Sequence, residues 1–85
     1  MTPRYMVENA VAGPETHYAE TANGALWLAR MLASGFAARL EIASAYSVFD
    51  LATTPPVRIR TVQWEPPYTW PIRPPWPLGW SYSEI

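Results

Sequence analysis

The chain has 85 residues, ten of them Pro and none of them Cys, and 15% of its side chains are charged. This length allows one small domain with an appendage. The net charge of −1 lacks the positive excess that drives non-specific binding to nucleic acid or to an anionic membrane. The longest uncharged stretch, residues 74–83, is too short for the roughly 20 apolar residues of a membrane helix.

We expect a cytoplasmic protein, found in the host cytoplasm or in the virion if a phage encodes it, because the N-terminus lacks the features of a secretory signal and the chain has no cysteine for disulfides. Ala, Gly, Pro and Arg are abundant and Lys is absent, which is typical of proteins from GC-rich bacterial or phage genomes.

Pro and Trp are unevenly distributed along the chain. Eight of the ten Pro lie at or after position 55, and four of the five Trp lie between positions 64 and 80. This shift in composition predicts a folded domain over residues 1–64 and a Pro/Trp-rich, extended tail over residues 65–85.

The sequence pattern of residues 1–64 predicts strands before and after a single helix. Residues 4–11 and 15–20 alternate on either side of Ala12-Gly13-Pro14, which predicts a β-hairpin. Thr21 can cap a helix from about Ala22 to Ser34, with Gly35 placed to end it in a left-handed conformation. Residues 38–49 and 57–62 alternate again and predict two further strands.

The order strand-strand-helix-strand-strand predicts an α+β fold with one helix packed on a small antiparallel sheet. The phases of the helix and of the strands predict a core that contains Val7, Tyr18, Leu28, Leu32, Leu40 and Ile42.

The predicted helix has more apolar surface than one sheet can bury. Leu26, Ala29 and Ala33 lie on a side away from the side that carries Leu28 and Leu32. Either the alanines tolerate solvent, or the tail, a second copy or another protein covers that side.

In the tail, WEPPYTWPIRPPWPLGW over residues 64–80 predicts a polyproline-like conformation. A period of three would place Trp64, Trp70 and Trp76 on one edge, with Arg73 able to stack between the last two.

We expect the Trp side chains of this tail to dock on an apolar surface, either of the same chain or of a partner. A ligand for domains that bind proline-rich peptides is a weaker alternative, because neither PxxP match has an Arg at the usual flanking offset. A membrane-active peptide would need an excess of cations. The candidate partner-binding residues are Leu26, Trp27, Trp64, Tyr68, Trp70, Arg73, Trp76 and Trp80.

Catalytic chemistry is not indicated by the sequence. His17 is the single His and lies between Glu15 and Glu20, and Glu15 is expected on the same strand face. The Ser residues lack a nucleophile elbow and the four Gly stand apart, so we expect no enzyme, no cofactor and no metal site.

Arg58 and Arg60 are predicted to project from one strand face in phase with Trp64, an arrangement compatible with stacking and phosphate contacts. Glu8 and Glu41 are available to neutralise them, so we favour a salt-bridged outer face.

We recognise no motif specific enough to carry a function from a known family. The leading expectation is a non-catalytic interaction or assembly protein that binds a protein partner or a second copy through the helix and the tail. The alternative is a small inhibitor that blocks one host enzyme or polymerase. A third is a weak binder of single-stranded nucleic acid.

Overall fold

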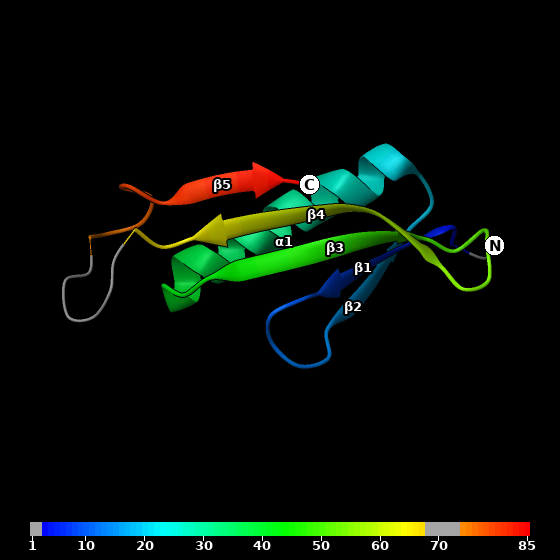
Figure 1. The fold of residues 1–85 in the computed structure, drawn as a ribbon, viewed down its shortest axis with the longest axis horizontal. Coiled ribbons are helices and arrows are strands. Elements are labelled where there is room, and N and C mark those ends of the chain that lie inside the picture. The colour runs from blue at the N-terminus through cyan, green and yellow to red at the C-terminus, as the bar shows by residue number, and fades with distance from the viewer. Residues whose placement is uncertain (1–2, 68–73) are drawn as a thin grey trace.

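A computed structural model describes residues 3–67 and 74–85 of the chain. It confirms the expected α+β fold, with one helix packed on a single antiparallel sheet (Figure 1). The elements are β1 (Tyr5–Asn9), β2 (Thr16–Ala19), α1 (Ala22–Leu40), β3 (Ser44–Asp50), β4 (Val57–Glu65) and β5 (Ser81–Glu84).

The sheet has the order β2-β1-β3-β4-β5, and each strand is antiparallel to its neighbours. β2 and β3 therefore run parallel to each other on either side of β1. Helix α1 connects these two strands in the chain and crosses one face of the sheet (Figure 1). The molecule is elongated, with Cα extents of 46 × 20 × 20 Å and a radius of gyration of 13.8 Å. About 12 Å is typical of a compact chain of this length.

The predicted β-hairpin is confirmed by the pairing of β1 with β2. Asn9 organises its turn, because the Oδ1 atom accepts hydrogen bonds from the backbone N–H groups of Val11 and Ala12 at 2.9 Å. The backbone N–H of Asn9 also donates to the carbonyl of Glu15 at 3.0 Å.

Helix α1 begins as predicted but ends later. The Thr21 hydroxyl accepts from the Gly24 N–H at 3.0 Å, as expected of an N-cap. The prediction that Gly35 ends the helix is wrong: the left-handed residue is Glu41, with φ 55°. The last turns bury Phe36 and Ala37 against the sheet, and this burial outweighs the roughly 1 kcal/mol that Gly costs inside a helix. The first residues of the strand predicted over residues 38–49 are therefore helical.

The core lies between an alanine face of α1 and the sheet. Ala25, Ala29 and Ala33 are fully buried, so the side expected to point away from the sheet in fact faces it. Small methyl groups let the helix lie close to the strands, while Leu28 and Leu32 flank the contact and are partly buried. The core cluster is completed by Val7, Phe36, Tyr46, Val48 and Val62.

Of the predicted core, Val7 is confirmed and three positions are wrong. Tyr18 is 57% exposed because it pairs with Met6 in register, on the sheet face opposite the helix. Leu40 and Ile42 are exposed because the longer helix carries them to its end and into the turn that follows.

The sequence did not predict β5. Residues 81–84 return to the sheet and pair with residues 62–65 of β4, with Trp64 opposite Tyr82. Beyond the strand, the N–H and C=O groups of Thr61 and Ile85 exchange two backbone hydrogen bonds of 2.7 and 2.9 Å.

Candidate functional site

An aromatic cluster forms where the tail returns to the sheet. The ring of Trp64 lies 4.6 Å from that of Trp76 and 4.7 Å from that of Tyr82, measured between centroids. The Trp76 and Trp80 rings are 5.1 Å apart and nearly perpendicular. Edge-to-face pairs of this kind add about 1 kcal/mol each beyond the area that they bury. The cluster therefore fastens the returning tail to β4.

Two turns bring Trp76 and Trp80 together. The Leu78 N–H donates to the Pro75 carbonyl at 2.9 Å, and the Trp80 N–H donates to the Pro77 carbonyl at 3.3 Å. Gly79 has φ 74°, and a Cβ there would lie 3.0 Å from the Cβ of Pro67. The polyproline prediction is therefore wrong over residues 75–80, because turns in this segment bend the chain back on itself.

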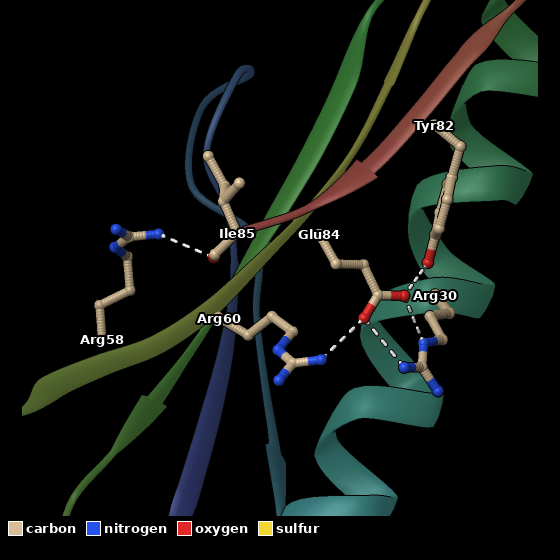
Figure 2. Close-up of polar contacts among 6 residues, drawn as sticks. All are labelled: Arg30, Arg58, Arg60, Tyr82, Glu84 and Ile85. Carbon is tan, nitrogen blue, oxygen red and sulfur yellow. Dashed lines mark hydrogen bonds and ion pairs between the residues drawn. The ribbon is translucent and has the colours of Figure 1, made fainter.

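Glu84 of β5 joins three elements (Figure 2). Its carboxylate accepts hydrogen bonds from Arg30 Nε at 2.7 Å and Nη2 at 2.9 Å, from Arg60 Nη1 at 3.1 Å, and from the Tyr82 hydroxyl. The Arg30 guanidinium is the main cause that holds the pKa of Glu84 at about 2. One carboxylate thus ties β5 to α1 and to β4.

The side of α1 that faces away from the sheet carries large apolar residues. Trp27 is 62% exposed and Met31 is 54% exposed, one turn apart. Arg30 is a neighbour of Trp27 on the helix surface and meets Tyr82 at the Glu84 carboxylate. Arg30 and the Glu84 carboxylate therefore link this side of the helix to Tyr82 of the aromatic cluster. We call this area the helix–tail surface; its residues are Trp27, Arg30, Met31, Trp76 and Tyr82.

The residues predicted to bind a partner fall into three groups. Trp64, Trp76 and Trp80 are brought together, while Trp27 lies apart on α1 and Leu26 packs partly buried against the core. The remaining three, and with them the predicted stacking on Arg73, lie outside the described residues: Tyr68, Trp70 and Arg73.

The sequence reasoning missed Arg30, Tyr82 and Glu84. The alternation of Ser81-Tyr82-Ser83-Glu84 is a weak strand signal that could have indicated β5. Nothing local indicates that Glu84 meets Arg30, which lies 54 positions earlier in the chain.

The prediction that Arg58 and Arg60 project from the same face of a strand is wrong. An irregularity between Val48 and Phe49 of β3 leaves Ile59 as an extra residue on β4, so the two Arg side chains project from opposite faces (Figure 2). Arg60 pairs with Glu84, whereas Arg58 donates to Thr61 Oγ1 at 2.6 Å and to the Ile85 carbonyl at 3.3 Å.

A second polar network holds the hairpin against β3. Glu15 accepts hydrogen bonds from the Tyr46 hydroxyl at 2.7 Å and from Asn9 Nδ2 at 3.3 Å, and His17 Nε2 lies 2.8 Å from its other oxygen. His17 and Glu15 thus meet as expected. Contact with His17 is the main cause that lowers the pKa of Glu15, and burial is the main cause that raises the pKa of Tyr46 to about 12. With Tyr46 1% exposed, this network has a structural role.

Among residues 3–67 and 74–85, no group of three or more His, Cys, Asp or Glu side chains is placed to hold a metal ion. Nor does this described part contain a helix with both the length and the apolar character that crossing a membrane requires. No protein-family model, curated protein or solved structure matches the chain.

Proposed function

We propose that this chain is a non-catalytic protein–protein interaction or assembly protein, of bacterial or phage origin and cytoplasmic location, that binds through the helix–tail surface. The observation that carries the proposal is the exposure of Trp27 and Met31, 62% and 54%, one turn apart on α1. Trp is enriched at interfaces because one buried indole contributes a large apolar area, and Met adapts to irregular partners.

The surroundings of these two residues support the same proposal. Arg30 and Tyr82 extend the surface to the aromatic cluster, and the Glu84 carboxylate fixes both side chains in place. A patch fixed in this way loses little conformational entropy when a partner binds. Aromatic residues and Arg beside an apolar centre are also the residue types that dominate binding energy in protein interfaces.

The test is affinity purification of the tagged protein from its native cells, with three variants. Trp27→Ala and Trp76→Ala remove side chains of the helix–tail surface. Tyr18→Ala removes an aromatic residue on the opposite face of the sheet that is exposed to a degree similar to Trp27. We expect the wild type and Tyr18→Ala to retain the same bound proteins, and each of the other two variants to lose a protein that these two retain.

A bound protein retained equally by all three variants would contradict the proposal. The stoichiometry of the purified complex distinguishes an assembly protein, which should be present in several copies, from the alternative, an inhibitor. A single enzyme or polymerase bound to one copy of the chain, with loss of that enzyme's activity, would favour the inhibitor.

A further inference from the structure

The outward side of α1 has the spacing of a helix-packing seam. Exposed or half-exposed positions recur at alternating intervals of three and four residues, opposite the buried alanines. Where two helices pack along their length, the residues in contact recur at these same intervals. The positions are Gly24, Trp27, Met31, Ser34 and Ala38, with Gly35 beside Ser34 on the same side.

Side-chain size along this seam is asymmetric. Trp27 and Met31 are large and precede the small residues Ser34, Gly35 and Ala38. Gly35 lies well inside the helix, is exposed, and would meet nothing within 4 Å if it carried a Cβ. Gly lowers the stability of a helix interior by roughly 0.5 to 1 kcal/mol relative to Ala, and none of the contacts around Gly35 offsets this loss.

Gly24 differs from Gly35 in this respect. A Cβ at Gly24 would approach the capping Thr21 Oγ1 to 2.9 Å, so the N-cap itself explains that glycine. Gly35 has no such explanation among the contacts of residues 3–67 and 74–85, and it lies on the exposed side that carries Trp27 and Met31.

We infer that the outward side of α1 binds the same side of a second copy, antiparallel, with the two-fold axis beside Met31. Positions 27 and 35 are each four residues from position 31. In an antiparallel pair whose helices cross at Met31 with their rows of residues 27, 31 and 35 aligned, the Trp27 ring of each copy lies over Gly35 of the other, a large side chain against a position that has none. Such a contact is isologous and closes as a dimer.

The charges of the helix permit this arrangement. The first turn of α1 contains no acidic residue, and Arg30, which lies at the edge of the seam, is already paired with Glu84 at 2.7 Å. The inference rests on the proposed function, because it names the occupant of the helix half of the helix–tail surface and leaves the aromatic cluster to another protein. One helix pair is a small interface, so we expect a dissociation constant on the order of 10 μM.

Cysteine cross-linking tests the symmetry, since the chain has no Cys of its own. Helix axes about 9 Å apart bring facing Cα atoms within the range of a disulfide. Met31→Cys should form a disulfide-linked dimer under mild oxidation, whereas Tyr18→Cys, on the far face of the sheet, should stay mostly monomeric. Equal cross-linking of the two variants would overturn the inference.

Light scattering and sedimentation over a range of about 5 to 500 μM test the association itself. The wild type should move from monomer to dimer, and Trp27→Ala and Gly35→Gln should remain monomeric. Both variants are expected to be monomers, so their melting temperatures can be compared directly. Because Gln is a better helix former than Gly, Gly35→Gln should melt no lower than Trp27→Ala. Its failure to associate would then not be caused by unfolding.

A wild type that stays monomeric throughout, or a Gly35→Gln variant that dimerises like the wild type, would overturn the inference. A monomer that still captures another protein through Trp27 would overturn the dimer and leave the proposed function standing.

Discussion

Arg30 on the helix and Glu84 on the last strand are joined by two hydrogen bonds, from Nε at 2.7 Å and from Nη2 at 2.9 Å, across 54 positions of sequence. This contact fastens to the core a strand of four residues that would be weak by itself.

Glu84→Gln removes the negative charge that Arg30 and Arg60 share. Because the Arg30 side chain is 48% exposed, water screens the pair, and we expect a loss of about 1 kcal/mol in the free energy of unfolding at neutral pH. Urea titration measures it.

The pH dependence of stability follows from the same carboxylate. The folded-state pKa of Glu84, about 2, lies below its ordinary value of 4.5, so its contribution is present above pH 4.5 and is lost as the pH falls toward 2. Urea titrations of the wild type at several pH values should show this decline, and Glu84→Gln should show a shallower one. The decline in stability that Glu84→Gln still shows at low pH is expected from Asp50 and Glu15, whose pKa values are also lowered in the folded protein. Identical pH profiles for the two proteins would contradict the assigned role of Glu84.

Ala29→Leu tests the close approach of α1 to the sheet. Ala29 is fully buried, so a larger side chain should push the helix outward and lower the free energy of unfolding by about 1 to 3 kcal/mol. Ala38→Leu, the same change at an exposed position of the same helix, should stay within about 0.5 kcal/mol at low protein concentration. Equal effects at the two positions would mean that the alanine face is not the packed one.

Trp80→Ala tests whether the aromatic cluster holds β5. Trp80 is 9% exposed, and removing such a ring usually costs about 3 to 5 kcal/mol. We expect hydrogen exchange to accelerate at the paired amides of β5, while those between β1 and β3 stay protected. Leu78→Ala, at an exposed position, is the control. Unchanged exchange at the β5 amides in Trp80→Ala would show that the cluster is dispensable.

Binding to single-stranded DNA or RNA should be absent or weak in an electrophoretic shift at about 50 mM salt, since Arg58 and Arg60 could neutralise at most about two phosphates. The structure gives a further reason, because these side chains lie on opposite faces of the sheet and Arg60 already pairs with Glu84. A dissociation constant at or below about 1 μM, abolished by replacing both Arg, would favour the nucleic-acid reading.

Local signals predicted the hairpin and the start of the helix. The alternation around Gly13-Pro14 and the capping side chain of Thr21 act over a few residues, so the sequence shows them directly. The end of the helix was not predictable in this way, because the burial of Phe36 against Tyr46 overrides the preference of Gly35 to end a helix.

The choice of the buried helix face also depends on contacts that are distant in the sequence. By hydropathy, Leu28 and Leu32 should face the sheet, yet the small Ala29 and Ala33 do so because a closer approach buries more backbone and strand surface. For the candidate site, composition pointed to the Trp residues. Their arrangement around Trp64 depends on β5, whose pairing with β4 leaves little trace in four residues.

The elongated shape, 46 × 20 × 20 Å, has a thermodynamic consequence. A body this narrow has a high ratio of surface to volume, so a smaller share of its apolar area leaves water on folding than in a sphere of equal mass. Its margin of stability is then small, and any protein that covers the outward side of α1 adds to it by mass action. With the proposed dimer, the melting temperature of the purified chain should therefore rise with its own concentration.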